Sequence, residues 1–452
     1  MSSSRDLAIF SEYLSTITVG AVSEPVLQVA KACLLYGLSV GMATRHVRAA
    51  VLARNASEGV DEEGTATRLI DGARKAYGSA IFANAVLLAA RVQGDSHPCG
   101  HIGTVVIPAA LGSAERANAS GPELLSALIS GYECALRIGR DHAADLSLRG
   151  FRTTPCYGVL GAAVAGARIA RFDGRRIKNT IAFAANFAGG LREFADAGTE
   201  ESPFQAGFAA RNGAYVVEVV ASGLEAADSA LHGSAGFYRT YGMPDTDYGA
   251  RLTEKLGEHF EFTTVTFKEH GVNQFHRGII RGLAELRGRA HGAAVSSIEI
   301  RMHPFEADFI GVRFAGPFTS PTQTVASAVF CASLAWTHGT ASFDALRTYD
   351  DSRVNMLLSK INVIADQFRK RYEPQIKVFL DDGSVLEWEE KSGDADYRLN
   401  WESASAMAVK LGREANVEEW RMNNLIECIS TMEKQANLRS LIAAVCTETI
   451  TT

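Results

Sequence analysis

The densest group of chemically useful side chains lies in and just before the stretch HPCGHIGTVVIPAALGSAE, residues 97–115. His97 and His101 are four residues apart, and Asp95 lies just upstream. Imidazole exchanges protons near neutral pH and a carboxylate can accept them, so these groups could perform general acid and base catalysis. We therefore predict catalytic roles here, with His101 foremost. The spacing is also compatible with a structural role, in which the two histidines only hold neighbouring strands or helices together.

This stretch is predicted to be a turn that opens into a helix. Glycines and a proline interrupt residues 94–103, and the run TVVIPAALGSAE from Thr104 predicts a helix entered past Pro108. Backbone N–H groups at a helix start carry partial positive charge, so the turn is expected to suit a bound carboxylate or phosphate.

Two other chemistries are less consistent with the pattern. The HxxxH spacing with Asp95 could ligate zinc, but it lies in a Gly/Pro turn and not on one helical face, so no metal is predicted. Cys99 and Cys156 also lie in loops, yet no Asn or Asp is placed to orient a cysteine nucleophile. Cysteine is also commonly a buried apolar residue.

Composition excludes several classes of protein. The 452 residues exceed the size at which one core stops growing, so two domains are expected. The net charge is −6 and no basic block occurs, which argues against a nucleic-acid partner. Seven scattered cysteines without CxxC spacing favour a reduced, cytoplasmic setting. No secretory pattern or apolar run of about 18 residues is present, so neither export nor membrane insertion is expected.

The chain reads as helical up to about residue 260. Apolar spacing predicts two helices within residues 5–55, and further helices over residues 77–90 and 122–140. Two more irregular stretches, residues 148–158 and 199–207, each lead into an Ala-rich helix. The pattern predicts a helical bundle whose loops could gather a site.

After about residue 260 the sequence pattern changes from helical to a mixture of predicted strands and helices. EFTTVTFK, SSIEIRMH and QIKVFLDDGSVLEWEE show strand alternation, with Asp382-Gly383 as a hairpin turn. RGIIRGLAELRGRA and TQTVASAVFCASLAWTHG predict helices between them, and residues 403–442 return to a helical pattern that could rejoin the first domain.

The loops also resemble a known family. HIGTVVIPAALGSAE, FRTTPCYGVLGAAVAGARI, GGLREFADAGTEESPFQAGFAARNG and GFYRTYG are similar in order and spacing to motifs of the MmgE/PrpD family. That family includes 2-methylcitrate dehydratase, cis-aconitate decarboxylase and iminodisuccinate epimerase, and the resemblance covers roughly residues 84–336.

The resemblance implies a mainly α fold, with a discontinuous all-helical domain of residues 1–262 and 403–452 and an inserted α+β domain of residues 263–402. It further implies a homodimer, a pocket between the domains, and no metal or organic cofactor. The family reactions move a proton at the carbon alpha to a carboxylate of a small di- or tricarboxylic acid, which calls for cations and proton carriers near one carbon.

Several family pocket positions look intact in this sequence. The resemblance places the motif histidine at His101, with His97 four residues before it. It likewise implies pocket roles for Lys268 and His276 in KEHGVNQFH and for Arg211 in AARNG.

Other pocket positions depart from the family pattern. Arg91 stands where a pocket aspartate is typical, with only Asp95 nearby, and Arg152 replaces a histidine. Ser202 and Gln205 lie in the segment that has lost a lysine and a histidine. Arginine suits bidentate binding of carboxylate but is a poor acid or base, so the changes keep positive charge while reducing the number of proton carriers.

The leading hypothesis is a cofactor-free lyase, of dehydratase or decarboxylase type, acting on a small polycarboxylate. His101 and Lys268 would transfer protons, and the arginines at 91, 152 and 211 would bind carboxylates. An epimerase or double-bond isomerase of a dicarboxylate is the first alternative. A non-catalytic family member that binds an acidic ligand is the second.

Overall fold

The computed structural model describes residues 2–58, 64–244 and 246–446. It divides into two compact units, of which unit 1 comprises Met1–Leu191, Glu201–Phe267 and Leu399–Thr452, and unit 2 comprises Arg192–Glu200 and Lys268–Arg398. The predicted fold class is confirmed, because unit 1 is almost entirely helical and unit 2 combines helices with a small mixed sheet. The domain boundaries proposed from the sequence stay a prediction.

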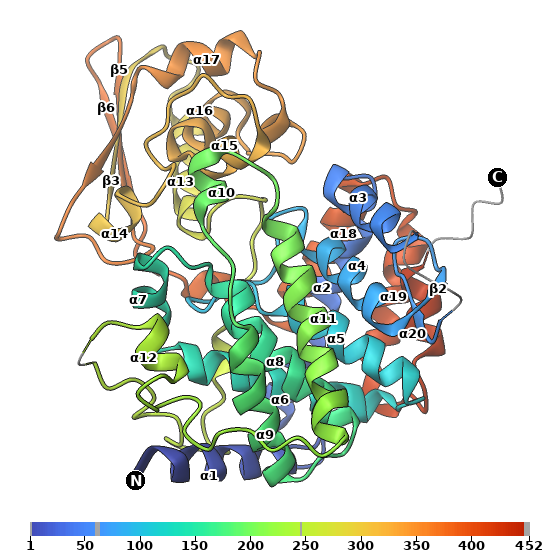
Figure 1. Cartoon of the computed structure of the whole chain (residues 1–452). Helices are drawn as coiled ribbons and strands as arrows, with labels where there is room; N and C mark the ends of the chain where they lie inside the picture. The colour runs from blue at the N-terminus through green and yellow to red at the C-terminus, as the bar shows by residue number, and fades with distance from the viewer. Residues whose placement is uncertain (1, 59–63, 245, 447–452) are drawn as a thin grey trace. The chain divides into compact units, whose positions relative to one another are not determined.

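Unit 1 is a bundle built from both ends of the chain (Figure 1). Its helices are α1 (Ser2–Thr16), α2 (Glu24–Met42), α3 (Arg48–Glu58), α4 (Tyr77–Ala89), α5 (Gly103–Arg116), α6 (Gly121–Gly139), α7 (Ala143–Leu148), α8 (Thr153–Ile169), α9 (Gly174–Ala184), α11 (Ser202–Ala221), α12 (Phe237–Tyr241), α18 (Trp401–Glu414), α19 (Glu419–Ser430) and α20 (Arg439–Val445). A short ladder joins β1 (Ala66–Thr67) to β2 (Arg74–Lys75).

The centre of this bundle is packed through small residues. At the crossing of α6 and α8, a Cβ added to Gly131 would lie 2.7 Å from the carbonyl oxygen of Gly161, and one added to Gly161 would lie 2.6 Å from that of Gly131. Only glycine allows such an approach of two backbones. The start of α6 is fixed by a reciprocal capping box between Ser120 and Glu123.

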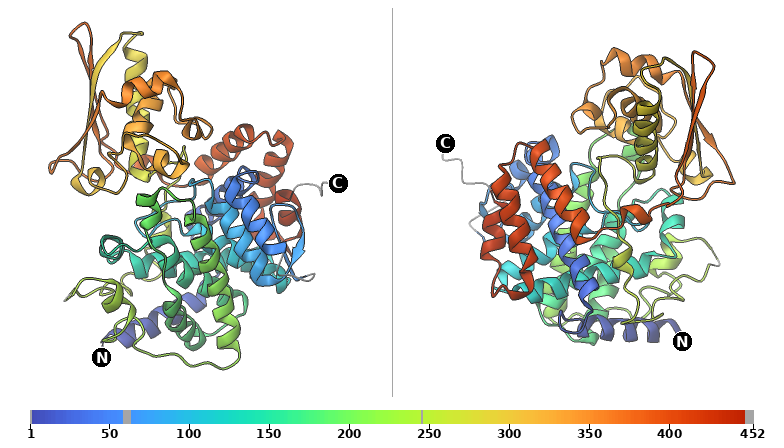
Figure 2. Two further views of the ribbon diagram at one scale, coloured as in Figure 1. Left: turned by 45° about the horizontal axis from the view of Figure 1, so that its top comes forward. Right: turned by 180° about the vertical axis from the view of Figure 1, so that it is seen from behind.

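The C-terminal helices pack on the N-terminal ones, with α18 against α2 (Figure 2). Among the described residues, α2 is the one helix long and apolar enough to cross a bilayer by length and composition. Its most apolar window is 83% buried inside the chain, as in the core helix of a bundle.

Unit 2 is built on a four-stranded sheet of order β4-β3-β5-β6. The strands are β3 (Val295–Met302), β4 (Ile361–Ala365), β5 (Gln375–Leu380) and β6 (Val385–Glu389). β4 runs parallel to β3, whereas β5 runs antiparallel to both β3 and β6, and the β5–β6 turn contains the predicted Asp382-Gly383. The helices are α10 (Glu193–Ala197), α13 (Arg277–Arg289), α14 (Pro304–Ala307), α15 (Pro321–Ala326), α16 (Ala328–His338) and α17 (Ser352–Leu358). Of these, α13 packs on β5 and β6, and α16 on β4.

One predicted strand is absent from the described structure. EFTTVTFK forms a 3-10 turn, η2 (Glu261–Thr264), followed by an isolated bridge between Ser96 and Thr266. The N–H groups of Glu261 and Phe262 donate to the carboxylate of Glu133 on α6, at 3.1 and 3.2 Å. A buried side chain thus takes the hydrogen bonds that a strand partner would supply.

Three helix starts also differ from the predictions. α5 begins at Gly103, so Pro108 lies inside it, and the helix continues past the missing N–H donor. α8 begins at Thr153 and α11 at Ser202, both within stretches predicted as loops. The prolines in these stretches, Pro155 and Pro203, fall in the first turn of each helix, where proline is tolerated.

Candidate functional site

Asp95 fixes the loop before α5 by capping that helix. The N–H of Gly103 donates to the Asp95 carboxylate, at 3.0 Å from Oδ1 and 3.2 Å from Oδ2, and the hydroxyl of Tyr132 on α6 donates to Oδ2 at 2.7 Å. Asp95 is 4% exposed. Its carboxylate is therefore held by two donors of the fold, the Gly103 N–H and the Tyr132 hydroxyl.

The expectation that the start of α5 binds a carboxylate or phosphate is wrong for the first helical N–H groups. The N–H of Gly103 is taken by Asp95, that of Thr104 by the carbonyl of His101, and those of Val105 and Val106 by the carbonyl of Ile102. The chain itself supplies the acceptors that a ligand would have offered.

His101 is presented by this loop with its ring orientation fixed. Its Nδ1 lies 2.7 Å from the main-chain carbonyl oxygen of Asp95, and its backbone N–H donates to Thr154 Oγ1 at 3.0 Å. A carbonyl only accepts, so the neutral ring carries its proton on Nδ1 and Nε2 is the basic nitrogen. The side chain is partly exposed. A histidine held in this tautomer has the chemistry of a general base, and the catalytic role of His101 stays a prediction.

Gly100 allows the loop to reach α8. Its φ is +102°, and an added Cβ would lie 2.7 Å from the backbone nitrogen of Thr154 and 2.8 Å from its Cα. A side chain here would be both strained and in collision with backbone. Gly100 thus brings the backbone N–H of His101 onto the first turn of α8.

His97 is engaged on both ring nitrogens. Nδ1 accepts the N–H of Cys99 at 3.2 Å, which places the proton on Nε2, 3.5 Å from the Glu261 carboxylate. Burial raises the pKa of Glu261, but its bonds to His97 and Arg140 outweigh that effect and lower the pKa to about 2. The catalytic role of His97 stays a prediction, and these contacts favour orientation of the loop.

Arg152, Ser202 and Gln205 come together within unit 1. Arg152 precedes α8 and donates from its guanidinium to the carbonyl of Ser202 and to Gln205 Oε1, the latter at 3.5 Å. The N–H of Arg152 donates to Gly190, and Gln205 Nε2 donates to Leu191. Burial lowers the pKa of Arg152 to about 10, so the side chain remains cationic at neutral pH. The cluster therefore holds a positive charge among carbonyl and amide groups, and a guanidinium is suited to binding a carboxylate.

The other two arginines contact residues outside this cluster. Arg91 is 3% exposed, donates to Gln93 Oε1 at 2.7 Å, and forms an ion pair with Glu414 on α18. Its charge is already compensated within the chain. Arg211 is exposed on α11 and lies against Gly78 on α4. It is six residues beyond Gln205, about 9 Å along the helix.

Lys268 and His276 lie together in unit 2. Lys268 is 1% exposed and donates to the carbonyl of Val272 at 3.0 Å. Burial, and then the charge of Lys268, lower the pKa of His276 to about 3. His276 is thus neutral at physiological pH and close enough to Lys268 to sense its charge.

Neither cysteine chemistry nor a metal cluster finds support among the side chains that the structure describes. Burial raises the pKa of Cys156 to about 12 and that of Cys99 well above its usual value, so both thiols stay protonated. No group of three or more His, Cys, Asp or Glu side chains placed to hold a metal occurs in residues 2–58, 64–244 and 246–446.

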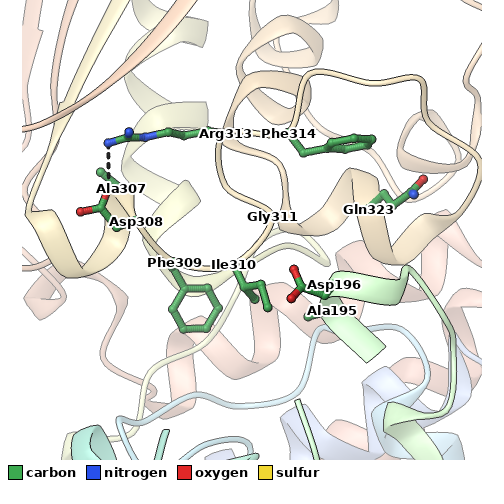
Figure 3. Close-up of a pocket in the computed structure, with 10 residues that line it drawn as sticks. All are labelled: Ala195, Asp196, Ala307, Asp308, Phe309, Ile310, Gly311, Arg313, Phe314 and Gln323. Carbon is green, nitrogen blue, oxygen red and sulfur yellow. Dashed lines mark ion pairs between the residues drawn. The ribbon is translucent and has the colours of Figure 1, made fainter. Parts of the chain in front are cut away.

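A pocket of about 450 Å³ lies within unit 2, between α10 and residues 307–323 (Figure 3). The rings of Phe309 and Phe314 line it, and Arg313 is ion-paired with Asp308 at 2.9 Å. None of the predicted site residues lines this pocket.

Sequence reasoning missed Tyr132, Thr154 and Glu261, which hold the loop in place. Tyr132 read as one position of an apolar helical stripe, and Glu261 as part of a strand. A buried tyrosine needs a partner for its hydroxyl, which is the one signal the sequence offered.

The loops that carry Asp95, His101 and Arg152 fall inside a segment that matches a known family. A family model described as the MmgE/PrpD N-terminal domain matches residues 8–247. The chain is also 27% identical over 279 residues to the cis-aconitate decarboxylase-like protein oryM of Aspergillus oryzae (strain ATCC 42149 / RIB 40). That alignment covers 58% of this chain and 57% of the relative, so the chain spans little more than half the length of the curated relative.

Proposed function

Because this chain belongs to the MmgE/PrpD family, whose model matches residues 8–247, we propose that it is a cofactor-free lyase acting on a small di- or tricarboxylic acid. The reaction is of dehydratase or decarboxylase type and proceeds by proton transfer alpha to a carboxylate. The name of the relative, a cis-aconitate decarboxylase-like protein, supports this reaction class. We further propose the homodimer and the cytoplasmic location expected from the sequence.

One observation carries the proposal: the 2.7 Å contact between His101 Nδ1 and the Asp95 carbonyl. It leaves Nε2 as the nitrogen that accepts a proton, on a partly exposed ring. Arg152 supplies a cation that stays charged at neutral pH, with Ser202 and Gln205 beside it, for a substrate carboxylate. Lys268, in unit 2, is the second proposed proton carrier.

A dicarboxylate epimerase or double-bond isomerase is the second candidate, and a specific observation favours it. The Asp95 carboxylate caps α5, and the Nε2 of His97 faces Glu261. Elimination of water needs an acid for the leaving hydroxyl as well as a base, whereas an isomerisation returns a proton to the substrate and has no leaving group to protonate. Asp95 and His97 are thus each engaged by groups of the chain itself.

The test is proton NMR of the purified chain with citrate, methylcitrate, aconitate and aminodicarboxylates in deuterated buffer. New vinyl signals from a saturated acid report elimination, signals of a product with one carboxylate fewer report decarboxylation, and deuterium uptake at the alpha carbon without net loss reports epimerisation. The lyase proposal requires elimination or decarboxylation of at least one acid. Melting shifts without turnover would support a binding protein and overturn the enzyme proposal.

Variants then test the assigned residues on the acid that reacts. His101→Gln is expected to lower kcat by at least about 100-fold, as is usual when a general base is removed. His46→Gln is the matched control, because His46 is exposed in unit 1 and outside the site. Lys268→Ala is compared with Lys370→Ala, an exposed lysine of the same unit. Unchanged turnover in His101→Gln would remove His101 from the mechanism.

A further inference from the structure

A chain of contacts links α6 to the ring of His101 through a single residue. Tyr132 donates its hydroxyl proton to Asp95 Oδ2 at 2.7 Å, and the main-chain carbonyl of Asp95 accepts the Nδ1 proton of His101 at 2.7 Å. Tyr132 therefore acts on the same residue that sets the tautomer of the proposed base.

The link is buried and closely packed. Tyr132 is 1% exposed and Asp95 is 4% exposed. A Cβ at Gly103 would lie 2.1 Å from the Tyr132 hydroxyl oxygen and 2.8 and 2.9 Å from the carboxylate oxygens of Asp95. A buried carboxylate is stable only with its donors in place, so Tyr132 and the Gly103 N–H together fix how Asp95 is turned.

We propose that Tyr132 is a positioning residue for His101, acting through Asp95. Its hydroxyl anchors the Asp95 carboxylate, and thereby the loop whose carbonyl at Asp95 keeps the His101 proton on Nδ1. Asp95 is then a positioning residue too, in place of the proton carrier predicted from the sequence. The inference rests on the proposed role of His101 as the base.

The physical consequence of losing the hydroxyl is a change of tautomer. The loop from Asp95 to Gly103 carries both the Asp95 carbonyl and the His101 ring, so loss of the Tyr132 anchor lets the loop backbone shift and weakens the contact between them. Burial, followed by the charge of Asp95, raises the pKa of Tyr132 well above its usual value, so its hydroxyl remains a donor at every working pH. Without the Asp95 carbonyl, the neutral ring favours the proton on Nε2, so the basic nitrogen becomes Nδ1, on the side of the loop backbone.

The experiment is nitrogen-15 NMR of the full chain labelled at its 11 histidines, which reads each ring tautomer directly. The His101 signals are those absent from His101→Gln. We expect the Nδ1–H tautomer in the wild-type chain and a shift toward Nε2–H in Tyr132→Phe. An Nε2–H tautomer in the wild-type chain would overturn the inference without any variant.

Tyr77→Phe is the matched control. Its hydroxyl lies 2.6 Å from Ser113 Oγ on the same helix, α5, ten residues from Gly103 and thus about 15 Å away. The His101 signals are expected to be unchanged there. Unchanged signals in a folded Tyr132→Phe variant would equally refute the inference. If Tyr132→Phe does not fold, Asp95→Asn is used instead, because it removes the charged acceptor of the Tyr132 hydroxyl. Unchanged His101 signals in Asp95→Asn would likewise refute the inference.

Turnover gives an independent readout. On any polycarboxylate that reacts, Tyr132→Phe is expected to lower kcat about 10-fold with KM within about twofold, because the base is misoriented while carboxylate binding is untouched. A purely structural role would lower thermal stability with kcat per folded chain unchanged. If no acid is turned over, the proposed function fails, while the tautomer measurement still decides the role of Tyr132.

Discussion

Gly103 is the position at which the smallest side chain should cause the largest disturbance of the site. In Gly103→Ala the new methyl group would overlap the Tyr132 hydroxyl at 2.1 Å and the Asp95 carboxylate at 2.8 Å. Overpacking of a core costs about 1–3 kcal/mol. Loss of one donor to a buried carboxylate costs about 1–3 kcal/mol more. We therefore expect the free energy of unfolding to fall by about 2–6 kcal/mol, and kcat to fall with it because His101 is no longer held.

Urea denaturation of the full chain, with hydrogen exchange at the α5 amides, measures this effect. The control is Gly20→Ala, because Gly20 has no heavy atom within 4 Å of an added Cβ and lies in the same unit. The reasoning is refuted if Gly103→Ala matches Gly20→Ala in stability and α5 exchange. It is also refuted if stability falls while the His101 tautomer and kcat per folded chain stay as in the wild type.

Three further outcomes are expected. Burial lowers the pKa of His142 to about 4. Burial and the charge of Lys268 lower the pKa of His276 to about 3. On acidification below about pH 6.5, these histidines therefore take up protons in the unfolded chain before they do so in the folded chain. The two neutral histidines therefore do not reduce the free energy of unfolding above about pH 6.5, whereas at pH 5 each lowers it by about 2 kcal/mol. Denaturation at pH 7.5 and at pH 5 should show a smaller pH dependence of stability in His142→Phe than in the wild type. Arg152→Gln should raise KM about 10-fold or more with a smaller change in kcat, since a charge-assisted bond to substrate is lost; steady-state kinetics would expose an unaffected KM. Glu133→Gln should lower stability by about 3–5 kcal/mol, because Glu133 and its partner Arg137 are fully buried; a melting temperature equal to wild type would contradict this.

The local sequence was sufficient for the elements whose signals are local. The spacing of apolar residues predicted α4 and α6 to within one residue, and the Asp382-Gly383 pair located the turn between β5 and β6. These signals persist because a helix face or a two-residue turn is decided by neighbours along the chain. The family motifs added the candidates His101 and Lys268.

What the tertiary structure alone decided is how each candidate side chain is used. Asp95 and His97 have the residue types of proton carriers, yet Asp95 caps α5 and His97 faces Glu261, 164 residues away in sequence. Arg91 is paired with Glu414, a partner no local pattern could name. A side chain's type sets what chemistry it can perform, but its hydrogen-bond partners decide whether that capacity is available to a substrate, and those partners come from distant segments. His101 remains the strongest candidate because its bond to the Asp95 carbonyl leaves Nε2 as its basic nitrogen.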